Sequence, residues 1–89
     1  MNLQESLKGY YNEEGQFDRL PGKRQKQKQA LMLEALASYF DKDRRYTERE
    51  VNHILNKYHT FNDPASLRRL MLGMKLLDRT LDGKVYWRI

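Results

Sequence analysis

The sequence predicts a small α+β domain in which three helices precede a C-terminal β-hairpin. Three observations lead to this prediction. The chain has 89 residues, fewer than the roughly 100–150 at which domains are commonest. Apolar residues recur with helical spacing in three stretches. Finally, an Asp-Gly pair separates two short apolar-containing runs at the C-terminus, which is a strong hairpin signal.

The first helix is predicted over residues 23–40, because nothing in that range breaks a helix. Its apolar face is formed by Leu33, Leu36, Ala37 and Phe40. Residues 1–16 are expected to form an N-terminal arm that is helical as far as Asn12, and residues 17–89 are expected to form the domain. The apolar positions of that arm are Leu3, Leu7, Tyr10 and Tyr11. This arm either mediates a homodimer or folds back on its own core.

Local signals define the next elements. Arg45-Tyr46 is long enough for one bridge of a strand, and Thr47 with Glu50 forms a capping box at the start of the second helix. The third helix begins where Asp63 can cap and Pro64 can occupy the first helical position. The apolar stripe of the second helix is Val51, Ile54, Leu55 and Tyr58, and that of the third is Leu67, Leu70, Met71 and Met74.

The chain ends in a predicted hairpin around Asp82-Gly83. Alternation places Val85, Trp87 and Ile89 on one face of its last strand and Lys84, Tyr86 and Arg88 on the other. We expect Trp87 in the core and the second set in solvent. The resulting order of elements is that of a winged helix-turn-helix, in which the third helix enters the DNA major groove. The same fold also serves as a protein-binding module.

The stretch from Phe17 to Arg88 also resembles a bacterial family of unknown function, whose members occur alone or C-terminal to ArsR-like helix-turn-helix regulators. The similar segments include Phe17-Asp18-Arg19-Leu20-Pro21, Arg45-Tyr46-Thr47-Glu48-Arg49-Glu50-Val51-Asn52, Leu67-Arg68-Arg69 and Tyr86-Trp87-Arg88. The resemblance implies a winged-helix-like fold and an association with transcription regulation, and it implies no activity. Lys75 stands where the family places a Gly before Leu-Leu, and a left-handed helix end would strain a Lys.

Positive charge is concentrated at the start of the first helix. The net charge is +5, and residues 19–33 hold five basic residues and no acidic one, whereas residues 1–18 hold one Lys and four acids. Cations at a helix N-terminus oppose the helix dipole, so stability does not select this pattern, and we expect it to contact phosphates. The candidate DNA-binding residues are Lys23, Arg24, Lys26, Lys28, Ser66, Arg68, Arg69, Lys84, Tyr86 and Arg88.

Arg68 and Arg69 point about 100° apart on a helix, so one can bridge guanine in the major groove while the other forms an ion pair with Asp63 or Asp78. Arg69 is the expected structural partner, because it adjoins Leu70 of the apolar stripe.

Other function classes find little support in the sequence. His53 and His59 fall on different faces without a third ligand, and no nucleophile–base set or Gly-rich phosphate loop occurs, so we expect neither a metal nor a cofactor nor an enzyme. Aromatic residues are too sparsely mixed with basic ones to favour RNA. No apolar run approaches the ~20 residues of a membrane span, there is no Cys, and no signal peptide begins the chain, which favours a cytoplasmic protein. We therefore expect a module that binds double-stranded DNA in transcriptional regulation. The alternative is a non-enzymatic module that binds a protein or senses a ligand without contacting DNA.

Overall fold

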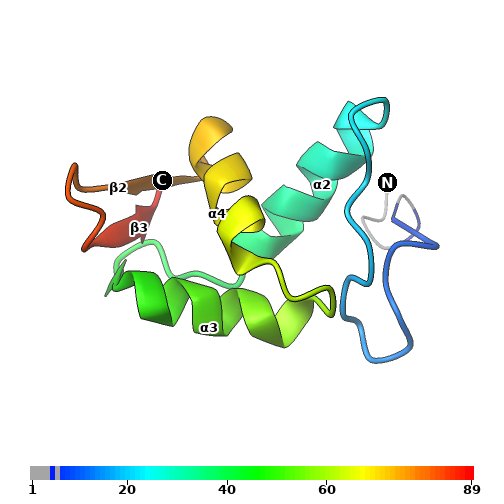
Figure 1. The fold of residues 1–89 in the computed structure, drawn as a ribbon, viewed down its shortest axis with the longest axis horizontal. Helices are drawn as coiled ribbons and strands as arrows, with labels where there is room; N and C mark the ends of the chain where they lie inside the picture. The colour runs from blue at the N-terminus through cyan, green and yellow to red at the C-terminus, as the bar shows by residue number, and fades with distance from the viewer. Residues whose placement is uncertain (1–4, 6) are drawn as a thin grey trace.

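The computed structural model describes Glu5 and residues 7–89. Residues 7–89 form three helices and a three-stranded antiparallel sheet, so the predicted α+β class is confirmed (Figure 1). In chain order the elements are α2 (Lys26–Ala37), β1 (Arg45–Tyr46), α3 (Glu48–Tyr58), α4 (Pro64–Gly73), β2 (Leu77–Arg79) and β3 (Tyr86–Arg88). None of these helices has the length and apolar character needed to cross a bilayer.

The sheet joins the predicted hairpin to the helical part of the chain. Its strand order is β1-β3-β2, with both pairings antiparallel. Tyr46 lies opposite Tyr86, and Arg45 lies opposite Trp87. The two residues predicted as a bridge therefore form an edge strand immediately before α3, and they tie the hairpin to the start of that helix.

The predicted start signals of α3 and α4 are confirmed. The Thr47 hydroxyl accepts from the Glu50 N–H at 3.1 Å, and the Glu50 carboxylate accepts from the Thr47 N–H at 3.0 Å, which completes the capping box. The Asp63 carboxylate accepts from the Ser66 N–H at 3.1 Å, and Pro64 follows the cap. The side-chain and backbone hydrogen bonds from Ser66 hold the pKa of Asp63 below its ordinary value.

A buried histidine fixes the loop between α3 and α4. The Nε2 atom of His59 accepts from the Asp63 N–H at 2.9 Å, so Nδ1 carries the proton and donates to the Leu55 carbonyl at 2.6 Å. Phe61 packs edge-on against the imidazole. Because His59 bonds the last turn of α3 and the cap of α4, it sets how these two helices meet.

The first predicted helix is shorter at both ends than expected. It begins at Lys26, because residues 22–25 form a turn closed by a bond from the Gln25 N–H to the Gly22 carbonyl at 2.9 Å. At its other end the N–H groups of Tyr39 and Phe40 bond three residues back, which tightens the last turn. Phe40 thereby reaches the core, whereas Tyr39 is 46% exposed.

From Leu7 to Asn12 the arm is not helical, although the sequence predicts a helix as far as Asn12. Gly9 has a φ of +93°, and Tyr11 forms a β-bridge with Phe17, which in turn bridges to His59. Leu7 is buried in the core of this chain, and Tyr11 packs against that core. The described part of the arm therefore folds back on the domain, which is one of the two expected alternatives. Leu3 lies outside the described residues.

The two faces of β3 are assigned the wrong way round by the sequence. Tyr86 is buried, with 3% of its surface exposed, whereas Trp87 is only partly buried and Ile89 is 57% exposed. Pairing with β1 is the cause, because Tyr46 and Tyr86 lie opposite each other and are both buried in the core. On the other face the Arg45 guanidinium covers the Trp87 ring at 5.2 Å. The side chains of β3 alternate between the two faces as predicted, but the face that is buried is the opposite of the one predicted.

The end of α4 places Lys75 in the left-handed conformation that is unfavourable for a Lys, and it corrects the predicted position of Met74. The helix ends at Gly73, which leaves Met74 38% exposed rather than in the apolar stripe. Lys75 has a φ of +60°. The Lys75 N–H bonds to the Leu72 carbonyl at 3.1 Å and the Leu76 N–H to the Met71 carbonyl at 2.9 Å, which is the Schellman pattern.

Candidate nucleic-acid interface

A groove of about 440 Å³ runs between the start of α2 and the exposed side of α4. Lys23 and Gln29 line it from one side, and Ser66 and Arg69 line it from the other. Its apolar lining comes from Leu20, Pro21 and Leu70. The Gln29 side chain donates to the Pro21 carbonyl at 2.9 Å, which holds the loop before α2 against that helix. The fold therefore brings together three of the predicted DNA-binding residues from segments far apart in the sequence.

The basic start of α2 continues from this groove. Residues 23–28 line a second, smaller hollow of about 340 Å³, and they include Lys23, Arg24 and Lys26. The first turn of α2 contains no acidic residue, and the side chain of Gln25 does not cap it. The cations thus face the positive end of the helix dipole without a compensating carboxylate. Lys28 differs from the others, because its ammonium lies 5.4 Å above the Tyr10 ring.

Of the two arginines of α4, it is Arg68 and not Arg69 that is mostly buried, and within the described residues the charge of Arg69 acts on Asp63 without an ion pair. The side chain of Arg68 is only 13% exposed, and it forms an ion pair with Glu48 at 3.0 Å. It also donates to the Asn52 carboxamide and lies 5.9 Å from the centre of the Tyr86 ring. Arg68 therefore ties α4 to α3 and to β3, through a partner that is neither Asp63 nor Asp78. Arg69 is exposed and borders the groove.

Of the three hairpin candidates, Lys84 alone is exposed. It lies in the loop between β2 and β3, where its N–H donates to Asp82 at 3.0 Å. The hydroxyl of Thr80 and this N–H hold the pKa of Asp82 below its ordinary value. Tyr86 lies in the core and has no surface for a ligand, and the Arg88 guanidinium donates to the Phe40 carbonyl at 3.1 Å.

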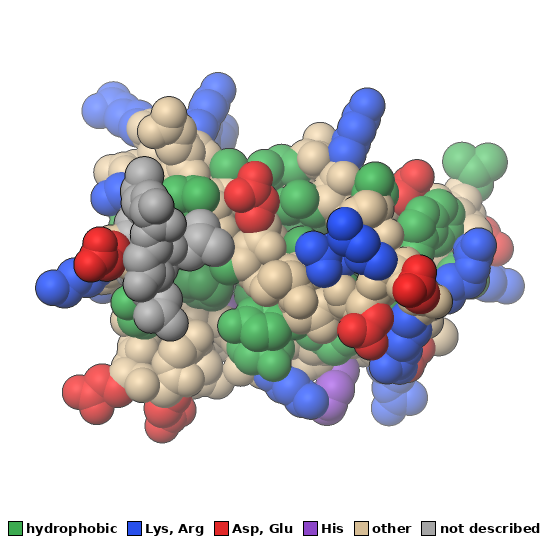
Figure 2. All heavy atoms as spheres, turned by 180° about the vertical axis from the view of Figure 1, so that it is seen from behind, with side chains coloured by type: hydrophobic (Ala, Val, Ile, Leu, Met, Phe, Trp, Pro, Cys, Tyr) green, Lys and Arg blue, Asp and Glu red, His purple; other side chains and the backbone are tan. Residues whose placement is uncertain are grey.

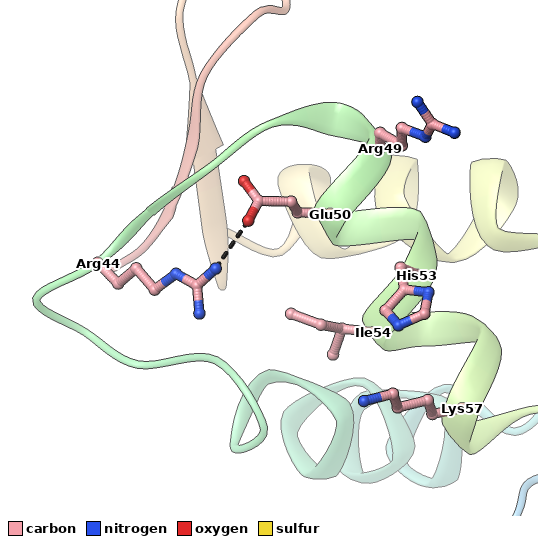
Figure 3. Close-up of a pocket in the computed structure, with 6 residues that line it drawn as sticks. All are labelled: Arg44, Arg49, Glu50, His53, Ile54 and Lys57. Carbon is pink, nitrogen blue, oxygen red and sulfur yellow. Dashed lines mark hydrogen bonds and ion pairs between the residues drawn. The ribbon is translucent and has the colours of Figure 1, made fainter.

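A second basic surface lies along α3, and none of its residues is among the DNA-binding candidates predicted from the sequence. Arg49, His53 and Lys57 follow one another at intervals of four residues, and with Arg44, Glu50 and Ile54 they line a hollow of about 400 Å³ (Figure 3). We call these six residues the α3 hollow. The four-residue spacing of the basic side chains could have been found in the sequence, whereas the position of Arg44 beside them depends on the fold.

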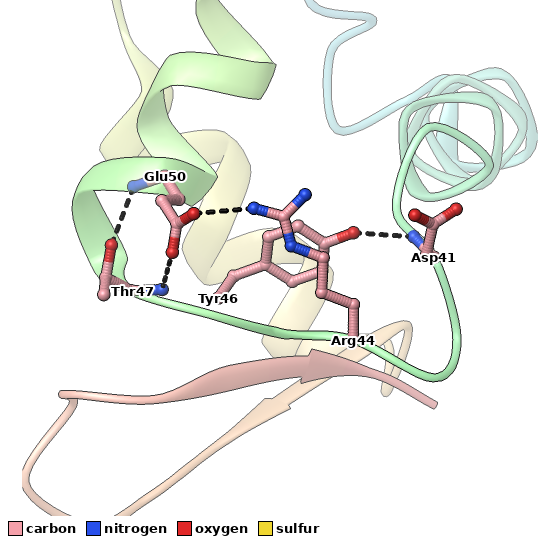
Figure 4. Close-up of polar contacts among 5 residues, drawn as sticks. All are labelled: Asp41, Arg44, Tyr46, Thr47 and Glu50. Atoms are coloured by element: carbon pink, nitrogen blue, oxygen red, sulfur yellow. Dashed lines mark hydrogen bonds and ion pairs between the residues drawn. The ribbon is translucent and has the colours of Figure 1, made fainter.

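Arg44 is held in place at the rim of the α3 hollow. Its guanidinium bonds the Glu50 carboxylate at 2.7 Å and lies 4.7 Å from the centre of the Tyr46 ring (Figure 4). The Tyr46 hydroxyl accepts from the Asp41 N–H at 2.7 Å, which fixes the turn that carries Arg44. The Thr47 N–H, and after it the Arg44 guanidinium, keep the pKa of Glu50 below its ordinary value.

Within Glu5 and residues 7–89, no three His, Asp or Glu side chains gather closely enough to hold a metal ion. His53 is exposed on α3, and both ring nitrogens of His59 are used in the loop between α3 and α4.

Comparison with known proteins identifies the family. Residues 16–88 match the pattern of a family described as an uncharacterized protein conserved in bacteria (DUF2087). The chain belongs to this family. The match covers all six described helices and strands and every residue of the groove between α2 and α4. No curated protein and no solved structure matches the chain significantly.

Proposed function

We propose that this protein is a winged-helix module that binds double-stranded DNA in the control of transcription. The order α2, β1, α3, α4, β2, β3, with β1 completing the sheet of the hairpin, is the order of elements in that fold. In such a module α4 enters the major groove, and the loop between β2 and β3 lies along the backbone. The proposal implies a cytoplasmic location, because that compartment contains bacterial DNA.

The observation on which the proposal depends is the shared groove of Lys23, Ser66 and Arg69. Lys23 precedes α2, whereas Ser66 and Arg69 lie on α4, so this arrangement combines phosphate-binding groups with the helix that would face base edges. An arginine can bridge the O6 and N7 atoms of guanine, and Arg69 is the exposed arginine of α4. Lysine and arginine at the start of α2 supply contacts that position the duplex without reading its sequence.

The proposed contact residues are fewer than the candidates predicted from the sequence. They comprise Lys23, Arg24, Lys26, Ser66, Arg69 and Lys84, which are exposed or line the groove. Arg68 supports them indirectly, because its bonds to α3 hold α4 in position. A single domain of this size covers a small part of a duplex, so two copies on a two-fold site would give useful affinity.

The test is the salt dependence of binding to a random DNA duplex, measured by fluorescence anisotropy. The wild-type affinity should fall steeply with salt, because each phosphate contact releases condensed counterions. The double variant K23Q/R69Q should lower the slope of log K against log salt by about 2, since each lost contact lowers it by about 1. The matched control K8Q/K42Q removes two exposed lysines elsewhere and should leave the slope unchanged.

Two results would count against DNA binding. Absence of binding at low salt favours the alternative, a module that binds a protein or ligand without contacting DNA. An equal change of slope in K23Q/R69Q and K8Q/K42Q would mean that binding depends on net charge and not on the groove.

A further inference from the structure

The α3 hollow lies on the side of α3 that faces away from α4. Arg68 of α4 contacts Glu48 and Asn52, which are four residues apart on one side of α3. Glu50 and Ile54 are also four residues apart, and they line the hollow on the other side. Figure 3 shows the Glu50 and Ile54 side chains directed toward Arg44, with α4 behind. A ligand in this hollow would therefore leave the exposed side of α4 free.

The basic side chains of the hollow are mostly uncompensated. Among Glu5 and residues 7–89, no carboxylate forms an ion pair with Arg49, His53 or Lys57, and Glu50 is already bonded to Arg44. From Arg49 to Lys57 the row extends about 12 Å along the helix axis, which matches a ligand with more than one negative group.

An aromatic stack adjoins the basic row. The rings of Tyr39 and Tyr58 are parallel to within 2°, with centroids 3.6 Å apart, and Tyr39 is 46% exposed. Tyr58 directly follows Lys57 and lies one turn beyond Ile54 on α3. The segment between α2 and β1 supplies both Tyr39 and Arg44. The same two segments therefore form the stack and the hollow.

Figure 2, which shows the molecule from behind, agrees with this arrangement. At the lower edge a His side chain lies beside Lys and Arg side chains, and hydrophobic side chains adjoin them on the same face. A planar surface beside a row of cations is the combination that nucleic-acid-binding proteins use to hold a base and its phosphate groups.

We propose that this surface binds a nucleotide, with the base on the exposed face of Tyr39 and the phosphates on Arg49, His53 and Lys57. Arg44 adds a guanidinium whose position is already fixed by Glu50 and Tyr46. The volume of about 400 Å³ is that of a small-ligand site. The ligand is a free nucleotide or one nucleotide of a single strand, since both present a base and phosphate. The site is separate from the proposed duplex surface and does not depend on it.

The first experiment divides the ligand into its two chemical parts. ADP, pyrophosphate and adenosine are titrated separately into the full-length protein, and binding is followed by calorimetry and by amide chemical shifts. ADP should bind about tenfold more tightly than pyrophosphate, because stacking of one base is worth about 1–3 kcal/mol. Adenosine should bind weakly and shift the amides near Tyr39, and pyrophosphate should shift those of Arg49, His53 and Lys57.

Variants separate the two halves of the site. Y39A should weaken ADP about tenfold, the loss expected from one stacking contact, and leave pyrophosphate affinity unchanged. R49Q/K57Q should weaken both ligands, whereas K8Q/K75Q, which removes the same charge elsewhere, should weaken neither. The K23Q/R69Q variant should bind ADP like the wild type, so failure of the duplex proposal would leave this one intact.

Several outcomes would overturn the nucleotide site. Absence of binding at millimolar ADP refutes it, as does equal binding of ADP and pyrophosphate, or an equal loss in the R49Q/K57Q and K8Q/K75Q variants. A thymidine pentanucleotide is the remaining probe. If the pentanucleotide binds more tightly than ADP, and if Y39A and R49Q/K57Q weaken its binding, the site is supported and its natural ligand is a single strand. If ADP binds more tightly, the source is the free nucleotide.

Discussion

Replacing Lys75 by glycine should stabilise the protein. Lys75 is the residue of the Schellman motif at the end of α4 that must take a left-handed conformation, with φ of +60°. That conformation costs a residue with a Cβ atom about 1–2 kcal/mol. Glycine avoids this cost. It also increases the conformational entropy of the unfolded chain, which offsets about 0.4–1 kcal/mol of the gain in stability.

The difference between these two ranges is about 0–1.6 kcal/mol, so K75G should raise the free energy of unfolding by about 0.8 kcal/mol. For a domain of this size such a gain raises the melting temperature by about 2–8 °C. Thermal and urea unfolding, followed by circular dichroism, measure both quantities. The comparison is informative because Lys75 is exposed and its side chain forms no hydrogen bond or ion pair within the described residues.

Two further substitutions at this position isolate the backbone effect. K75A retains the Cβ atom and should be no more stable than the wild type, whereas K75N should be intermediate, because asparagine tolerates the left-handed region better than other residues do. If K75A is as stable as K75G, then the strain is not the reason for the gain, and the reasoning is refuted.

Three other predictions concern stability. R68A should lose about 1–3 kcal/mol of unfolding free energy, because it removes charge-assisted bonds from a mostly buried site, whereas R69A should change it by under about 0.5 kcal/mol; equal values in urea unfolding would contradict the assigned roles. Y86A should cost about 3–5 kcal/mol and W87A about 1 kcal/mol, since Tyr86 is the buried aromatic residue of β3, and a reversed order in the same assay would restore the face predicted from the sequence. Folding lowers the pKa values of Glu50 and Asp63 from their ordinary values of 4.5 and 3.8. Both carboxylates therefore stabilise the folded state at pH values above these ordinary pKa values, and this stabilisation is lost as the pH falls through the lower pKa values of the folded state. Melting temperatures from pH 6 to pH 2 should therefore fall less in E50Q/D63N, which keeps both caps without their titration, and an unchanged pH profile would show that these carboxylates do not contribute.

Local signals in the sequence determined where most elements begin. Thr47 and Glu50 form a capping box, Asp63 and Pro64 start α4, and Gly83, with φ of +72°, allows the turn between β2 and β3. These features were predictable because each depends on a few consecutive residues and on the backbone groups within their reach. The left-handed position at Lys75 did not follow from such a local signal, because a Lys there argues against it, and only the resemblance to the family pointed to that geometry.

Tertiary structure alone decided which faces are buried and which distant charges meet. Tyr86 and Trp87 are both suitable core residues, and the pairing of Tyr86 with Tyr46 selects the first. Glu48 lies on α3, so only the packing of α4 against α3 makes Arg68 the structural arginine and leaves Arg69 exposed. The packing of α2 against α4 joins Lys23 to Arg69 in one groove, and the segment between α2 and β1 brings Arg44 beside the row along α3. The physical reason is that burial and ion pairing depend on neighbours in space, and a periodic pattern specifies a face without specifying what covers it.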